Sequence, residues 1–163
     1  VTMVCGFRAL KDYRMKESNI CEISRMLSAK PEESAQAVKR LQDEAKSWRE
    51  KLIQTQSRAM EQILENLPEH VENYLVFKKD VDKNVARRFV DEGKSKCQGI
   101  CGIFLGNDED GYRYILGSES VDLKAFSKTF HETLGGKGGG KGEMMQGTVN
   151  ASEETIRNYI EKK

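Results

Sequence analysis

Three features are scarce or missing in this sequence, and each absence excludes a class of protein. The longest apolar runs are too short to span a bilayer, and no charged-then-apolar leader opens the chain. Charged residues make up 33% of the chain, yet they nearly cancel to a net charge of +1. No global field therefore draws the protein onto nucleic acid, and any such binding must use local patches. We expect a cytoplasmic protein without a membrane partner.

Residues that bind metals are also few. The two histidines, His70 and His131, do not lie at ligand spacing from any of the four cysteines. Cys97 and Cys101 suggest a disulfide or a metal pair, but both fall on an expected strand. Four residues along a strand separate the Cα atoms by roughly 13 Å, whereas a disulfide needs about 7 Å or less. We expect reduced, buried cysteines and no metal site.

No strong catalytic constellation is apparent. The sequence offers no strong candidate for a nucleophile beside a base, for a metal site or for a catalytic carboxylate pair. A Walker A motif is excluded because Lys141 is followed by Gly142 and not by serine or threonine. The glycines also do not follow a strand directly, which argues against a dinucleotide-binding fingerprint. We therefore expect a binding module and not an enzyme in this chain.

The most informative feature that is present is a glycine-rich segment, residues 135–142, with six glycines and two lysines. Glycine allows positive φ and close approach to main-chain N–H groups, and the lysines favour an anion such as phosphate. A candidate helix over residues 151–161 could add a positive dipole end. A flexible linker is the alternative, but the glycines lead into a Met-Met-Gln-Gly sequence typical of packed structure. The predicted phosphate-binding residues are Gly135, Gly136, Lys137, Gly138, Gly139, Gly140, Lys141 and Gln146.

Three further residues are candidates for the same site. Arg87 and Arg88 are interleaved with acidic residues, so a solvated helix face is the default interpretation. Together with Lys137 and Lys141 they could instead form a phosphate-binding patch. His131 lies four residues before the glycine run and could approach a bound anion.

The first part of the chain is expected to form a helical arm. A strand over residues 1–5 would be the end of a larger sheet, and 3–4 spacing of apolar residues predicts a helix over 7–27. Pro31 favours the start of a second helix over 31–66, roughly 54 Å long. The short connection predicts an antiparallel helical hairpin, a coiled coil spanning residues 7–67. The predicted heptad residues are Val38, Leu41, Ala45, Trp48, Leu52, Thr55 and Ala59.

The second part, residues 68–163, is expected to form a small three-layer α/β domain, which makes the fold class α+β or α/β overall. Asp80 is the expected cap of its first helix, and Ser120 or Asp122 that of its second. The predicted order is strand 74–78, helix to 93, strands 98–105 and 112–116, helix to 134, the glycine-rich loop, and helix 151–161.

Two segments resemble one family. Residues 135–147 resemble the glycine-rich signature in the C-terminal DHH-associated domain of alanyl-tRNA synthetases and their editing relatives, a module shared more distantly with RecJ-type phosphoesterases. Residues 5–13, Cys-Gly-Phe-Arg-Ala-Leu-Lys-Asp-Tyr, resemble the stretch that leaves the editing domain of those proteins and enters a helical arm. The phosphoesterase branch has histidine where this sequence has Lys141, and Gly142 stands where proline is common in the synthetases.

The resemblance implies a function for the whole chain. In that family an editing domain hydrolyses mischarged tRNA(Ala) with a zinc ion, and its His-x-x-x-His and Cys-x-x-x-His motifs would both lie before Val1. Residues 1–6 would then be the end of that editing domain, with the zinc cofactor outside this chain. The implied parent is a synthetase or a free-standing editing protein, and the implied partners are tRNA(Ala) and a second copy in a homodimer. The alternative is a purely structural dimerisation module.

Overall fold

A computed structural model describes residue 3, residues 5–68 and residues 71–161, which fall into two compact units, Val1–Leu52 and Ile53–Lys163. The division between these two compact units lies inside the long helix, because the end of that helix packs against the α/β part. The predicted first strand falls largely outside the described residues, and neither Met3 nor Cys5 is in a strand.

The structure confirms the two predicted N-terminal helices. Helix α1 covers Gly6–Met26, the short 3₁₀ helix η1 covers Pro31–Glu33, and α2 covers Ser34–Glu65. The helices pack together at their connection, where the buried hydroxyl groups of Ser24 and Ser34 are hydrogen bonded at 2.9 Å.

Farther from the connection, the apolar seam of both helices is exposed. Leu10 of α1 is 45% exposed, and Trp48 and Leu52 of α2 are 68% and 57% exposed. The side chains of the predicted heptad pattern therefore lie largely in solvent in this chain.

The second unit is built on one mixed sheet of five strands in the order β1-β2-β3-β5-β4. Strands β1 and β2 are parallel, and the other three neighbouring pairs are antiparallel. The strands are β1 (Tyr74–Lys78), β2 (Cys101–Asn107), β3 (Gly111–Gly117), β4 (Lys137–Lys141) and β5 (Met144–Val149); the helices are α3 (Lys83–Gly93), α4 (Leu123–Leu134) and α5 (Glu153–Glu161).

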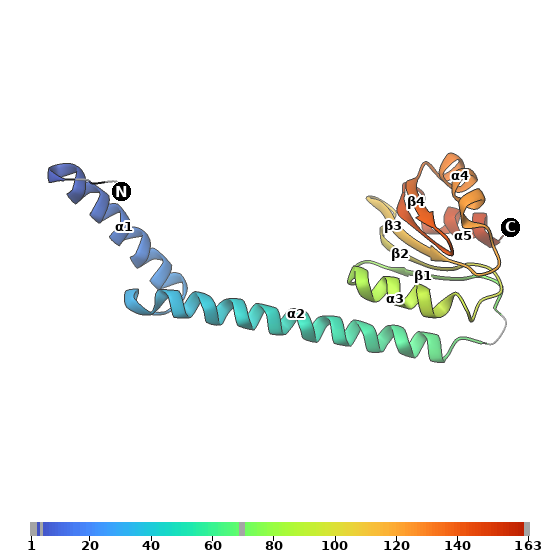
Figure 1. Cartoon of the computed structure of the whole chain (residues 1–163), viewed down its shortest axis with the longest axis horizontal. Coiled ribbons are helices and arrows are strands. Elements are labelled where there is room, and N and C mark those ends of the chain that lie inside the picture. The colour runs from blue at the N-terminus through green and yellow to red at the C-terminus, as the bar shows by residue number, and fades with distance from the viewer. Residues whose placement is uncertain (1–2, 4, 69–70, 162–163) are drawn as a thin grey trace. The chain divides into compact units, whose positions relative to one another are not determined.

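Helices cover both faces of this sheet, as the predicted three-layer arrangement requires (Figure 1). Helices α4 and α5 bury one face with a core that includes Tyr114, Phe130 and Ile156. Helix α3 and the end of α2 cover part of the other face with a core that includes Phe89 and Met60. The fold class predicted from the sequence is confirmed.

Side-chain caps fix the starts of two helices. The Asp122 carboxylate accepts a hydrogen bond of 2.9 Å from the Lys124 amide, as predicted for α4. Helix α3 begins later than expected, because Asp82 and not Asp80 is its cap and accepts from the Asn84 amide at 2.9 Å.

The glycine-rich segment differs most from its predicted structure. It is not a loop: residues 137–141 form an edge strand, β4, paired in register with β5, which the sequence analysis also missed. Gly135, at φ 64°, ends α4 in the left-handed conformation, and Gly142, at φ 68°, begins the two-residue turn between the strands. Glycine at the first central position is typical of a type II′ hairpin turn.

Two further glycines are required by close packing. A Cβ atom on Gly138 would lie 2.5 Å from the carbonyl oxygen of Gln146, and one on Gly140 would lie 2.1 Å from that of Met144. Gly139 differs, because a Cβ there would meet nothing within 4 Å.

The cysteine pair also differs from expectation. The chain turns after Cys97, so the two thiols of Cys97 and Cys101 are hydrogen bonded and not strand-separated. This bond lowers the pKa of Cys97, while the same bond together with burial raises the pKa of Cys101. Both are buried free thiols as predicted, but Cys5 is exposed and Cys21 is half-buried.

Alanine substitutions in β4 should distinguish the closely packed glycines, Gly138 and Gly140, from Gly139. We expect Gly138→Ala and Gly140→Ala to lower the free energy of unfolding by about 1–3 kcal/mol, because the new methyl group overlaps the β5 backbone. Gly139→Ala should change it by no more than about 0.5 kcal/mol. Urea denaturation of the three variants measures this, and equal losses at all three positions would contradict the assignment.

Candidate functional site on the open sheet face

The candidate site lies on the α3 side of the sheet, over the part of β3, β5 and β4 that α3 leaves uncovered. Pairing across the three strands sets side chains in rows: Arg113 lies beside Thr148, which lies beside Lys137. In the next rows, Ile115, Gln146 and Gly139 are neighbours, and Met144 lies beside Lys141. We call this set of eight residues the open face: Arg113, Ile115, Lys137, Gly139, Lys141, Met144, Gln146 and Thr148.

Two hollows lie along the open face and share Ile115 and Gln146. The smaller, of about 320 Å³, is also lined by Arg87 of α3 together with Gly139 and Lys141. The larger, of about 730 Å³, extends past Arg113 to the segment before α3. That segment adds two lysines and two aspartates to its rim: Lys79, Lys83, Asp80 and Asp82.

Four cations of this surface have no carboxylate partner among the described residues. Arg87, Arg113, Lys137 and Lys141 are all exposed, and within the described residues none of them forms an ion pair. These four positive charges around Gly139 are not neutralised. They therefore give this surface a local positive potential, although the chain as a whole is nearly neutral.

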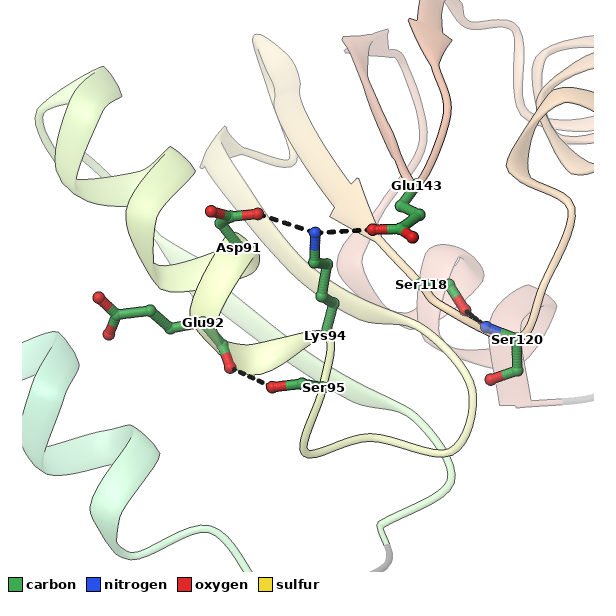
Figure 2. Close-up of polar contacts among 7 residues, drawn as sticks. All are labelled: Asp91, Glu92, Lys94, Ser95, Ser118, Ser120 and Glu143. Carbon is green, nitrogen blue, oxygen red and sulfur yellow. Dashed lines mark hydrogen bonds and ion pairs between the residues drawn. The ribbon is translucent and has the colours of Figure 1, made fainter.

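Another lysine anchors the hairpin that carries the site (Figure 2). The Lys94 ammonium group lies 2.9 Å from a carboxylate oxygen of Asp91 and 2.9 Å from one of Glu143 in the β4–β5 turn. These hydrogen bonds, the one to Glu143 first, raise the pKa of Lys94. The Glu143 carbonyl also accepts from the Ser118 amide at 3.0 Å, so the turn is fixed from two sides.

Some predicted site residues lie elsewhere. The Arg88 guanidinium group points away from the site toward Glu92, at 2.6 Å, and Glu61, at 3.6 Å. His131 lies on the opposite side of the sheet, where its Nε2 atom is 2.5 Å from the hydroxyl oxygen of Tyr114. Of the glycines, Gly135 and Gly136 close α4, and Gly138 packs over Tyr114. The structure thus brings together Arg87, Lys137, Gly139, Gly140, Lys141 and Gln146.

The expected contribution of the last helix is not found. Helix α5 begins at Glu153, whose amide donates a hydrogen bond of 2.9 Å to the Asp108 carboxylate in the β2–β3 turn. A carboxylate of the chain itself therefore occupies the positive end of this helix, and not the glycine segment.

Arg113 and Thr148 were missed by the sequence analysis. Arg113 stands between Tyr112 and Tyr114, so two-residue alternation within the predicted strand already placed it on the opposite face from those aromatic residues. No such signal existed for Thr148, because β5 itself was not predicted.

These features define a small three-layer α/β domain with a glycine-rich hairpin at one edge of its sheet. The family model described as DHHA1 domain matches residues 71–162, and the chain belongs to this family. It is also 32% identical over 158 aligned residues to the alanine–tRNA ligase of Magnetococcus marinus. That match covers 88% of this chain but only 18% of the ligase.

The described residues contain neither a metal-binding cluster nor a membrane-spanning helix. No group of three or more histidine, cysteine, aspartate or glutamate side chains among them is arranged to hold a metal ion. None of the helices described is both long and apolar enough to cross a membrane.

The buried tyrosine beneath the hairpin predicts loss of stability in alkali. Burial raises the pKa of Tyr114 from 10 to about 12. The pKa of Tyr114 is higher in the folded chain than in the unfolded chain. The contribution of this hydroxyl group to the free energy of unfolding is therefore complete below pH 10 and is lost as the pH rises toward 12. The free energy of unfolding, measured in urea across this range, should fall. In the Tyr114→Phe variant the free energy of unfolding should fall less steeply with pH. An unchanged slope of this free energy against pH would contradict the assignment to Tyr114.

Proposed function

We propose that this chain is the tRNA-binding and oligomerising C-terminal module of an alanyl-tRNA synthetase or related editing protein. On this proposal it binds, and a separate domain hydrolyses mischarged tRNA(Ala). The observation that carries the RNA-binding part is the cluster of four unpaired cations, Arg87, Arg113, Lys137 and Lys141, around the open face. The family and the similarity to an alanine–tRNA ligase support tRNA as the nucleic acid.

The geometry of the cluster suits a phosphate backbone. Lys137 and Lys141 lie on the same face of one strand, which separates their Cα atoms by roughly 13 Å. Between them Gly139 has no side chain, so a bulky backbone can approach the strand closely. Thr148 and Gln146 add hydrogen-bonding groups along the adjacent strand. Contacts of this kind are electrostatic and independent of base sequence.

Removal of the two strand lysines tests the proposal. Binding of fluorescently labelled tRNA(Ala) by the 163-residue chain, followed by anisotropy, should weaken in the Lys137→Ala, Lys141→Ala double variant. The slope of log affinity against log salt concentration should become shallower by about 1 for each lysine lost.

A matched control removes the same charge elsewhere. Lys124 and Lys128 are exposed on α4, which covers the other side of the sheet, and their double alanine variant should bind tRNA(Ala) like the parent. Equal losses in the two double variants would show that only net charge matters. That result would refute the assignment of RNA binding to the open face.

The exposed seam of the helical arm favours self-association as a second activity. Val38, Leu41, Trp48 and Leu52 follow heptad spacing on α2 and are all exposed. Exposed apolar stripes of this kind are typical of helix–helix interfaces. Dimerisation without any contact to nucleic acid remains the alternative function.

Light scattering coupled to size exclusion tests this part. We expect the parent chain to form a dimer and Trp48→Glu to shift it to monomer, because a carboxylate would be buried in an apolar seam. Ser47→Glu adds the same charge at an exposed neighbouring position outside the heptad pattern and should leave the dimer intact. A parent chain that is monomeric at every concentration would exclude this activity.

A further inference from the structure

Strand β4 is an open edge of the sheet. It is the last strand in the order β1-β2-β3-β5-β4, and all five of its residues are exposed. An edge strand has a row of backbone N–H and C=O groups without sheet partners, which another extended chain can pair with.

The hairpin register identifies which groups these are. The turn between β4 and β5 contains only Gly142 and Glu143, so Lys141 and Met144 flank a two-residue turn. In such a hairpin the flanking residues form a hydrogen-bonded pair, and bonded pairs alternate along the strands. Gly139 and Lys137 therefore also direct their backbone groups toward β5. The outward N–H and C=O groups belong to two residues without side chains, Gly138 and Gly140.

The charges of β4 select among partners. Lys137 and Lys141 are placed symmetrically about Gly139, so an antiparallel pairing of two copies centred there would set lysine directly opposite lysine twice. Like charges directly opposite each other destabilise a strand pair, whereas opposite charges stabilise it. The edge therefore disfavours its own copy and favours an extended segment with acidic residues four positions apart.

We propose that the β4 edge binds an extended acidic peptide segment of a protein partner, antiparallel to β4. The first and fifth residues of the segment are acidic and lie opposite Lys141 and Lys137. The second and fourth exchange backbone hydrogen bonds with Gly140 and Gly138. The third lies over Gly139, where an aromatic side chain covers the exposed glycine. This goes beyond the proposed RNA-binding function, because it uses the backbone edge of β4 and a protein partner.

The probe is a labelled peptide with the core glutamate–valine–phenylalanine–valine–glutamate, and the readout is fluorescence anisotropy with the full chain. Replacing both glutamates by lysines should weaken binding roughly tenfold, since two attractive pairs become repulsive. N-methylation of the second and fourth peptide amides should abolish binding, because those amides face β4. N-methylation of the third should have little effect, because that amide faces away.

Protein variants complete the test. In the Lys137→Glu, Lys141→Glu double variant the preference should reverse, so that the lysine-ended peptide binds more tightly than the glutamate-ended one. The Lys124→Glu, Lys128→Glu variant on α4 should keep the original preference. A preference that does not reverse, or methylation effects independent of position, would overturn the proposal.

Gly139→Val separates this proposal from RNA binding. The position has negative or extended φ and open space around its Cβ, so the variant should fold. A β-branched residue favours the strand, so peptide binding should be kept or strengthened. Its side chain lies on the open face and should hinder close approach of an RNA backbone there. Loss of peptide binding in a folded Gly139→Val variant would contradict peptide binding at the β4 edge, whether or not the variant still binds tRNA(Ala).

Discussion

The packing of the Tyr114 hydroxyl group against the β4–β5 hairpin determines how the rest of the site is arranged. A Cβ atom on Gly138 would lie 2.6 Å from this oxygen, and one on Gly147 would lie 2.7 Å from it. Two facing glycines therefore let the hairpin cross the tyrosine ring, and the hydroxyl group of that ring is hydrogen bonded to Nε2 of His131. The hydroxyl group thereby has a partner although it is buried. The same packing commits one side of the hairpin to the core and leaves the other side open.

The parts of the fold that the sequence predicted have strong local signals. Apolar spacing and the proline start located α1 and α2 within one to three residues, and the apolar run of β1 matched its strand at both ends. Asp122 was among the expected caps because its carboxylate can accept from the first free amides of α4. These signals are carried by side chains within one element, so they need no knowledge of tertiary contacts.

The hairpin was missed because its strand is specified by tertiary contacts. Glycine disfavours strands by propensity, so the run from 137 to 141 contained nothing that predicts β structure. Positions 138 and 140 require glycine because the β5 backbone lies close to them, and this closeness exists only in the folded chain. The same limit applies to the candidate site, whose lysines were predicted only from their place between glycines. Their alignment with Arg113 across three strands depends on pairing that could not be inferred.

Gly139 is the one glycine of the segment that folding does not explain. Gly135 and Gly142 have positive φ, and the Cβ atoms of Gly136, Gly138 and Gly140 would clash, so folding alone accounts for five of the six glycines of the segment. At Gly139 neither reason applies, and a larger residue would strengthen the strand. A glycine at this position is explained if a binding partner must come close to the backbone of β4. The lysines on either side favour a partner with negative charge.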